Sequence, residues 1–291
     1  MAAGRLPDFI GVGPARTGTT WLDNVLRGHV GLPAGIKETG FFGLRYSRGI
    51  EWYRWHFRDC KRDEPVGEIC PYFSFPLAPT RISRHIPRCK IICTIRDPVE
   101  RAYSHYKMLR YFGYVKPVSF EQALTMHTRA VEDSRYAFYL VMWQQKFGKE
   151  NVLITFYDDL RDNPQQFVDS ICNFIGIPSI PLAGLKISDT AVHSLDRAAL
   201  NHRRAVNGHH FLNRLRRRGA YRTIDVLGRA GLWKYTFGGG EPFPALPPDV
   251  EARIRERFRP EISALERLIG RDLTAWKVPR VSRRFPTRPA K

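Results

Sequence analysis

The sequence predicts an α/β protein in which a central parallel sheet lies between two layers of helices, a three-layer α/β/α architecture. Short apolar runs of strand length alternate with segments of helical periodicity over roughly the first 175 residues. This alternation is typical of parallel sheets covered by helices. The run Lys90–Ile95 is almost wholly apolar and rich in β-branched residues, as expected for a strand buried on both faces. Hydrophobic residues make up 43% of the 291 residues, which is typical of a globular chain.

The chain opens with a predicted strand, turn and helix. Phe9–Val12 is a short apolar run, Gly13–Gly18 is a glycine-rich turn, and Thr19–Arg27 carries apolar residues at helical spacing. A short aromatic helix is expected at Glu51–Phe57, and a second buried strand at Val66–Ile69.

The strand Lys90–Ile95 is expected to lead into a helix that ends near Tyr111. Asp97 is suited to be the N-cap of this helix, and Pro98 fits its first turn. The elements that follow are a helix, a second helix, a strand and a third helix closed by glycine, at Ser119–Ala130, Tyr136–Phe147, Val152–Tyr157 and Pro164–Gly176.

The last third of the chain has a different character. We expect a single domain over residues 1–276, in which residues from about 188 to 245 form a helical region rich in arginine and histidine, without a convincing strand before Tyr235. Glycines and prolines predict a loop over Gly238–Gly240 and Pro242–Pro248, and Asp249–Leu268 is a final amphipathic helix. Residues 277–291 are basic and contain proline, which predicts a poorly ordered tail.

Charge and cysteine content narrow the class of protein. Lysine and arginine number 47 against 28 acidic residues, a formal charge of +19 that favours anionic partners such as nucleotides, sulfated or phosphorylated ligands, nucleic acid or an anionic membrane. The five cysteines are an odd number without a C-x-x-C pair, so neither a metal site nor a disulfide framework is expected. The N-terminus runs directly into a strand, and no apolar run approaches the roughly 18 residues of a membrane-spanning helix. We therefore expect a cytoplasmic enzyme without a transmembrane segment.

The turn G-P-A-R-T-G-T-T at Gly13–Thr20 stands where a phosphate-binding loop belongs, after a strand and at the start of a helix. Its spacing is that of a Walker A loop, but Thr19 occupies the lysine position. Arg16 returns a cation to the loop three residues earlier. Taken alone, the pattern fits a phosphate cradle and a simple tight turn equally.

Three motifs together resemble the PAPS-dependent sulfotransferases, in particular the bacterial members and the glycosaminoglycan or Golgi type. The first is the loop itself, with a proline, a basic residue, a Ser/Thr and then G-T-T-W. The second is R-D-P-V-E-R-A-Y-S, which begins at Arg96 and ends at Ser104, and the third is I-K-E-T-G-F-F at Ile36–Phe42. The resemblance covers about the first 180 residues and implies the P-loop NTPase-like sulfotransferase fold, with PAPS (3′-phosphoadenosine 5′-phosphosulfate) as the sulfonate donor and PAP as the product.

The resemblance implies a role for each donor-binding residue. The loop would hold the 5′-phosphosulfate through Pro14, Ala15, Arg16, Thr17, Gly18, Thr19 and Thr20. Arg96 and Ser104 would bind the 3′-phosphate that distinguishes PAPS from ordinary adenine nucleotides. Their chemistry agrees, since a guanidinium offers a bidentate fork and Ser104 adds a hydroxyl; the alternative is that Arg96 pairs with Asp97 or caps a strand end. Arg16 would stabilise the leaving phosphate during in-line transfer.

On the acceptor side, the resemblance implies Glu38 as the general base and Lys37 as its support. An ordinary surface Lys–Glu pair is the alternative, and His29 and His56 are rival bases. The expected acceptor is a hydroxyl, in preference to an amine, of a small molecule, carbohydrate or lipid, and the basic composition is compatible with an anionic one.

Several features depart from the family pattern or match it loosely. Ile69 and Cys70 stand where glycosaminoglycan-type relatives carry lysine and Ser/Thr, which leaves the identity of the substrate open. The stretch His193–Arg222 would bind an anionic acceptor or the adenosine, or else is a solvated helical face. Gly238–Gly240 lies roughly where relatives place a glycine-and-basic loop near the 3′-phosphate.

Two other classes of function fit the sequence less well. A kinase-like P-loop enzyme needs a lysine in the loop and a strand ending in an aspartate for Mg²⁺, and the sequence offers neither. A basic nucleic-acid-binding protein would account for the charge but not for two phosphate motifs, and no nucleic-acid-binding module is recognisable. We therefore expect neither a bound metal nor nucleic acid as a partner.

Overall fold

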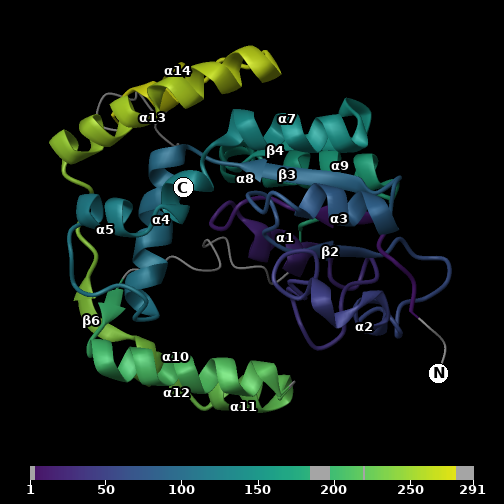
Figure 1. The fold of residues 1–291 in the computed structure, drawn as a ribbon, viewed down its shortest axis with the longest axis horizontal. Coiled ribbons are helices and arrows are strands. Elements are labelled where there is room, and N and C mark those ends of the chain that lie inside the picture. The colour runs from purple at the N-terminus through teal and green to yellow at the C-terminus, as the bar shows by residue number, and fades with distance from the viewer. Residues whose placement is uncertain (1–3, 184–196, 219, 280–291) are drawn as a thin grey trace.

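The computed structural model describes residues 4–183, 197–218 and 220–279. Its central sheet has four parallel strands, β1 (Phe9–Gly11), β2 (Gly67–Ile69), β3 (Lys90–Ile95) and β4 (Val152–Phe156), in the order β2-β1-β3-β4. The predicted parallel sheet is confirmed, and all four expected strands are present within a residue or so of their predicted bounds (Figure 1).

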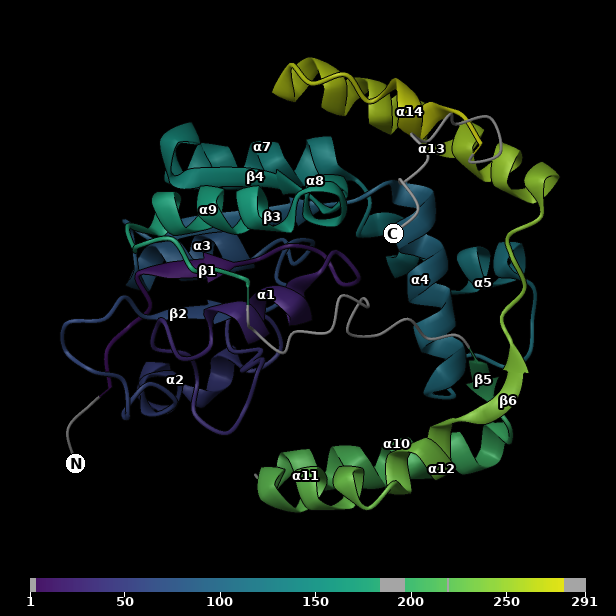
Figure 2. The same cartoon turned by 180° about the vertical axis from the view of Figure 1, so that it is seen from behind.

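Helices cover both faces of the sheet and enclose two apolar cores. Alternating side chains of β3 separate the two: Ile91 and Ile95 belong to one core and Ile92 to the other. The first core also takes residues of α2 (Ile50–Trp55), α3 (Ala78–His85), α7 (Tyr136–Phe147) and α13 (Pro248–Ile269). The second is closed by α1 (Thr19–Leu26) and α9 (Pro164–Ile175). This arrangement confirms the three-layer architecture (Figures 1 and 2).

Two segments next to the sheet differ from the sequence prediction. The expected single helix at 119–130 is wrong: the chain forms α5 (Phe120–Met126) and α6 (Arg129–Glu132), with non-helical backbone at His127 between them. Threonine and histidine have low helix propensity, which allows a break at this point. Tyr157, expected to end the strand β4, instead begins a short helix, α8 (Tyr157–Asp162).

The C-terminal region contains two strands that the sequence analysis did not find. β5 (Arg197–Ala199) pairs with β6 (Gly239–Pro242) in a small antiparallel sheet, so the expectations of no strand before Tyr235 and of a plain loop from Gly238 were wrong. Both strands are very short and lack the β-branched residues that favour strands, so only tertiary pairing specifies them. Between them lie α10 (His202–Arg217), α11 (Tyr221–Arg229) and α12 (Leu232–Phe237), as the helical pattern predicted.

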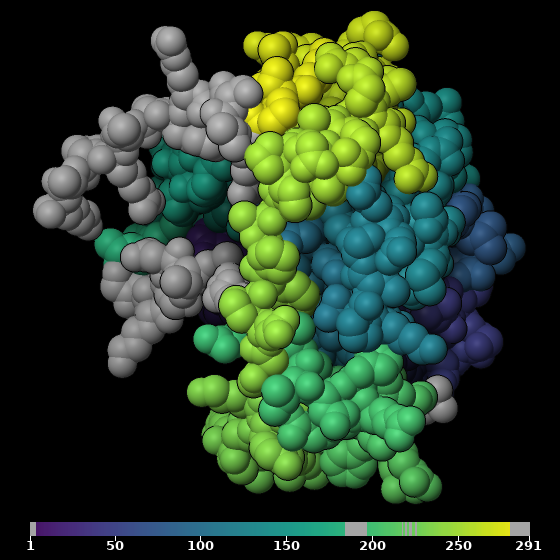
Figure 3. Space-filling view, turned by 90° about the vertical axis from the view of Figure 1, so that its left-hand side faces the viewer, coloured from purple at the N-terminus to yellow at the C-terminus, as the bar shows by residue number. Residues whose placement is uncertain are grey.

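The helix α4 (Pro98–Tyr111) connects the two ends of the molecule. Figure 2 shows α10, α11 and α12 near one end of α4, and α13 with α14 (Thr274–Lys277) near the other. The connection from β6 to α13 runs along the surface beside α4 (Figure 3), where the hydroxyl of Tyr103 donates a hydrogen bond of 2.5 Å to the carbonyl of Pro244.

The following features complete the description of the chain. Two short 3₁₀ helices lie at Tyr46–Arg48 and Lys149–Asn151. Residues 188–196 and 219 of the predicted helical region lie outside the described residues, as do residues 280–291 of the predicted tail. The five cysteines are free thiols, and none of the helices in the described ranges combines the length and the apolar character needed to cross a membrane.

Candidate functional site

The loop Gly13–Thr20 leaves the carboxyl end of β1 and passes close to β3. A Cβ atom at Gly13 would lie 3.0 Å from the carbonyl oxygen of Thr94, so a side chain there would push the loop away from the neighbouring strand. Gly18 has φ +88°, a backbone conformation that glycine adopts without strain, and it begins α1. The hydroxyl of Thr17 is fully buried and donates a 2.8 Å hydrogen bond to the carbonyl of Pro14. Thr17 thus closes the loop on itself.

Arg16 is held in an unusual conformation within this loop. Its φ is +77°, in the left-handed region that costs a non-glycine residue about 1–3 kcal/mol. Its Nε atom donates a 2.9 Å hydrogen bond to Oγ of Ser104, two turns into α4. Burial, and then the neighbouring charge of Arg96, lower the pKa of the Arg16 guanidinium to about 10. The loop therefore presents a partly desolvated cation beside the start of α4.

Arg96 lies at the carboxyl end of β3, adjacent to Arg16. One of its terminal nitrogens donates to the carbonyl of Arg16 at 3.3 Å, and the other pairs with the carboxylate of Glu100 at 3.3 Å. The guanidinium lies over the ring of Tyr157, 4.2 Å from its centroid. The Tyr136 hydroxyl donates a 2.7 Å hydrogen bond to the Arg96 carbonyl. Both the backbone and the side chain of Arg96 are thereby fixed.

Asp97 caps α4 as the sequence predicted. One carboxylate oxygen accepts from the backbone N–H groups of Val99 and Glu100 at 2.9 and 3.2 Å. The other accepts from Arg255 of α13 at 2.8 Å. The alternative in which Arg96 pairs with the Asp97 carboxylate is therefore not what is observed: the ion pair of Arg96 is with Glu100, one turn along α4.

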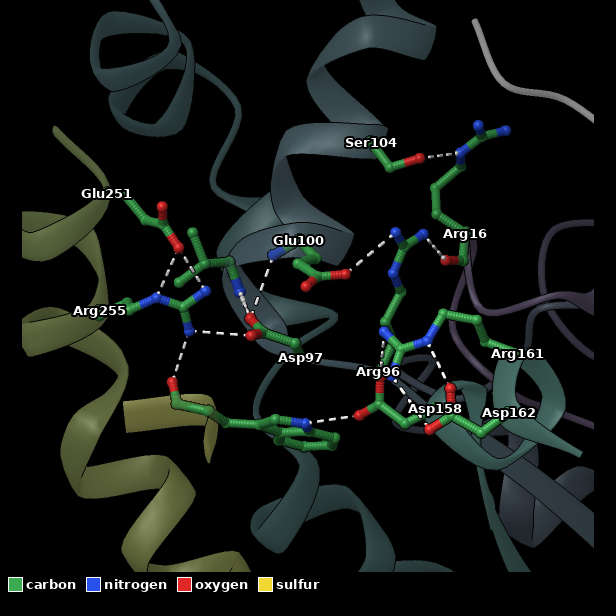
Figure 4. Close-up of polar contacts among 12 residues, drawn as sticks. Arg16, Arg96, Asp97, Glu100, Ser104, Asp158, Arg161, Asp162, Glu251 and Arg255 are labelled. Carbon is green, nitrogen blue, oxygen red and sulfur yellow. Dashed lines mark hydrogen bonds and ion pairs between the residues drawn. The ribbon is translucent and has the colours of Figure 1, made fainter. Parts of the chain in front are cut away.

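The fold explains why these residues meet. In open parallel sheets ligands bind beyond the carboxyl ends of the strands, where the strand order reverses. The order β2-β1-β3-β4 places that reversal between β1 and β3, which are the strands that lead into the loop and into Arg96. Figure 4 shows Arg16, Arg96 and Ser104 gathered there, with Glu100 pointing towards Arg96. The two motifs, some 80 residues apart in the sequence, thus contact each other in the fold.

The Lys37–Glu38 pair lies near the carboxyl end of β2, the strand next to β1. Nζ of Lys37 and Oε1 of Glu38 are 2.6 Å apart, and the two side chains are 25% and 42% exposed. Burial and the charges of Glu68 and Glu38 raise the pKa of Cys70, which follows β2. Glu38 is thus close to the end of β2, the strand next to β1. Ile69 and Cys70, the two departures from the family pattern, are both buried.

Glu68, which the sequence analysis did not single out, anchors this segment. It is fully buried in β2, and its carboxylate accepts from the backbone N–H and the hydroxyl of Thr39 at 2.7 and 2.6 Å. The hydroxyls of Tyr53 and Tyr72 donate to its second oxygen at 2.9 and 3.2 Å. Desolvation raises the pKa of Glu68. A glutamate within the apolar run V-G-E-I-C was the signal that could have identified it.

The rival histidines have different surroundings. His56 is buried edge-on against Trp52 and Trp55, and burial with the charges of Arg58 and Arg45 lowers its pKa to about 4. His29 is exposed after α1. His105, which the sequence analysis also missed, follows Ser104 and is buried; burial and nearby arginines lower its pKa to about 3.

The arginine-rich stretch and the glycine run lie away from this cluster in sequence and fold. The described part of 193–222 forms β5, α10 and the start of α11, with exposed Arg203, Arg214, Arg216 and Arg218. The exposure of these arginines fits the interpretation of a solvated helical face. Gly238–Gly240 contributes to β6 instead of forming a loop. Within residues 4–183, 197–218 and 220–279, no group of three or more His, Cys, Asp or Glu side chains is arranged to hold a metal ion.

Comparison with known proteins identifies the family. The sulfotransferase domain family matches residues 6–215. Curated relatives include the bifunctional heparan sulfate N-deacetylase/N-sulfotransferase 2 of Bos taurus, 31% identical over 198 residues, and N-deacetylase/N-sulfotransferase 1 of Caenorhabditis elegans, 26% identical over 196 residues. Each alignment covers 60% of this chain and 22% or 23% of the relative, so the chain spans less than a quarter of their length.

Among solved structures, a sulfotransferase from Alicyclobacillus acidocaldarius superimposes with a TM-score of 0.67 and 21% identity, covering 94% of this chain and 99% of that one. This likeness bears on the fold and agrees with the parallel sheet described above. Together with the domain match over residues 6–215, it shows that the chain belongs to the sulfotransferase family and has the P-loop-like sulfotransferase fold.

Proposed function

We propose that this chain transfers a sulfonate group from PAPS to an acceptor and releases PAP. The observation that carries the proposal is the meeting of Arg16, Arg96 and Ser104 at the reversal point of the sheet. Burial, and then the charge of Arg96, lower the pKa of Arg16, so an added negative charge would favour the charged form of its guanidinium. An anion with two separate charged groups, such as the 5′-phosphosulfate and 3′-phosphate of PAPS, would be attracted to both arginines.

The loop and α1 would hold the 5′ end of the donor. Backbone N–H groups of residues 15–20 and the positive end of α1 favour an anion there, and Thr19 and Thr20 are partly exposed in the first turn. As the bond from sulfur to the bridging oxygen breaks, negative charge develops on the leaving 5′-phosphate. Arg16 would stabilise that charge, because its guanidinium is already fixed and partly desolvated.

Arg96 and Ser104 would hold the 3′-phosphate. The Ser104 oxygen accepts from Arg16, which leaves its hydroxyl hydrogen available to donate to a phosphate. The ring of Tyr157 packs against one face of the Arg96 guanidinium and helps to fix its orientation. The sequence analysis did not assign Tyr157 a role, although it lies within the first 180 residues that the resemblance covers.

Glu38 is the proposed base that takes the acceptor's proton, and Lys37 the group that orients it at 2.6 Å. The predicted acceptor remains a hydroxyl of a small molecule, carbohydrate or lipid. An amine is a second candidate, because the relatives of this chain are named N-sulfotransferases. Product analysis by mass spectrometry, with matched amino-sugar and hydroxy-sugar acceptors, distinguishes a sulfamate from a sulfate ester.

Calorimetric titration with PAP, ADP and ATP tests the donor assignment. We expect tight binding of PAP and weak binding of the other two, because only PAP carries a phosphate for Arg96 and Ser104. Equal binding of ATP, the outcome for a kinase-like enzyme, would contradict the proposal, as would the absence of PAP binding. The cytoplasmic location expected from the sequence remains a prediction, which fractionation of the source cells would test.

A further inference from the structure

A buried arginine of the C-terminal helix α13 contacts the motif that carries Arg96. Arg255 is 1% exposed, and its Nη1 atom donates to Oδ2 of Asp97 at 2.8 Å across a separation of 158 residues. Its Nε and Nη2 atoms donate to Oε1 of Glu251 at 2.8 and 2.6 Å. Nη1 also donates to the carbonyl of Trp276 at 2.5 Å. Figure 4 shows this guanidinium on the opposite side of the Arg96–Glu100 turn from Arg16.

Asp97 transmits this contact to the proposed 3′-phosphate site. It directly follows Arg96, and its other oxygen caps α4 through the N–H groups of Val99 and Glu100. Glu100 in turn pairs with the Arg96 side chain. A shift of the Asp97 carboxylate would therefore move both the backbone next to Arg96 and the carboxylate that orients its guanidinium.

A second route from the same end of the chain reaches the other face of Arg96. The indole N–H of Trp276, whose carbonyl accepts from Arg255, donates to Oδ2 of Asp158 at 2.7 Å. Asp158 follows Tyr157, whose ring lies beneath the Arg96 guanidinium. Arg255 and Trp276 thus join α13 and α14 to both the backbone side and the ring side of Arg96.

The energetics favour a positioning role over a stabilising one. Burying an arginine with carboxylates contributes little net stability compared with apolar residues of similar size, because desolvation offsets the attraction. Removing Arg255, however, would leave Asp97 and Glu251 buried without their shared cation, and would place more negative charge beside the proposed phosphate site. We propose that Arg255 is a positioning residue that holds Arg96 in register for the 3′-phosphate. This inference rests on the proposed assignment of Arg96.

The test compares Arg255→Met with Arg253→Met in the full chain. Arg253 lies on the same helix but is 58% exposed and pairs with Glu121 and Asp249, so it is a matched control. Calorimetry gives Kd for PAP and for AMP, which differ in the 3′-phosphate. We expect Arg255→Met to reduce the ratio of the two affinities about tenfold or more, the scale of one hydrogen bond to a charged group. Arg253→Met should leave the ratio unchanged, and Arg255→Lys should restore part of it.

Each outcome bears on the inference. If Arg255→Met weakens PAP and AMP equally, the residue is merely structural and the inference is overturned. If that variant does not fold, Arg255→Lys retains the buried cation but cannot donate to Asp97, Glu251 and the Trp276 carbonyl in the same geometry; a ratio equal to that of the unmodified chain would then overturn the inference, and a reduced one would support it. If the unmodified protein does not distinguish PAP from AMP, the donor assignment fails, and the inference fails with it.

Discussion

Replacing Arg96 with methionine tests the assignment of the 3′-phosphate site most directly. The guanidinium can offer two charge-assisted hydrogen bonds to a phosphate, and a hydrogen bond to a charged group contributes about 1.5–3 kcal/mol. Arg96 already makes 3.3 Å contacts with Glu100 and with the Arg16 carbonyl. A bound phosphate would weaken these contacts, so part of its favourable binding free energy is offset by their loss. A net loss of about 3 kcal/mol, or roughly a hundredfold in PAP affinity relative to AMP, is expected.

The neighbouring carboxylate requires a second variant. In Arg96→Met alone, Glu100, whose side chain is 6% exposed, would face the phosphate without the charge of Arg96, and repulsion would add to the loss. The double variant Arg96→Met/Glu100→Gln removes that charge, so its PAP to AMP ratio measures the missing guanidinium itself.

Calorimetry at about 0.15 M salt, where exposed charges are screened beyond about 8 Å, provides the ratio for each protein. AMP affinity serves as the internal control for the folded state. If both variants still prefer PAP to AMP as strongly as the unmodified chain does, the 3′-phosphate is bound elsewhere and the reasoning from the R-D-P motif is refuted.

Three further predictions concern the base, the loop and a buried histidine. Glu38→Gln should lower kcat by about 10²-fold or more while PAP affinity stays within twofold, as expected when a general base is lost; unchanged turnover would dismiss Glu38 as the base. Gly18→Ala should lower thermal stability by about 1–2 kcal/mol, because φ is +88° and the new Cβ would lie 2.8 Å from Leu160, and a variant as stable as the parent would contradict this geometry. Because the pKa of His56 is lower in the folded chain than in the unfolded chain, the imidazole is protonated in the unfolded chain first as the pH falls. The contribution of neutral His56 to the free energy of unfolding is therefore fully present above pH 6.5 and is lost progressively towards pH 4. Melting curves of His56→Gln should show a flatter pH dependence over that interval, and an identical slope would exclude His56 as the source.

The strands and helices around the site were predictable because local signals agree with the fold. Asp97 and Pro98 mark the start of α4, Gly176 ends α9, and the apolar run Lys90–Ile95 became β3 with the predicted bounds. The loop and the R-D-P motif could be found because each has fixed spacing after a strand. The two motifs meet because of the order of the strands in the sheet, and no local sequence pattern predicts that order.

Other features depend on contacts that have no local pattern. β5 and β6 pair through Arg-Ala-Ala and Gly-Gly-Glu-Pro, sequences without strand propensity. Arg255 looks like one of many arginines on an amphipathic helix, and only the structure brings it to Asp97. Glu68 is intermediate: its place in an apolar run is a signal of a buried carboxylate that the sequence analysis did not use, and the three residues that donate to it come from separate segments.

The left-handed backbone of Arg16 sets stability against activity at a single position. Glycine would adopt φ +77° without strain, so Arg16→Gly relieves this strain, and that gain offsets the chain entropy and the hydrogen bond to Ser104 that the change costs. The same change deletes the cation proposed to act on the leaving group. Directed evolution that selects for thermostability alone would therefore tend to accept glycine here and lose turnover, whereas selection on product formation would retain the strained arginine.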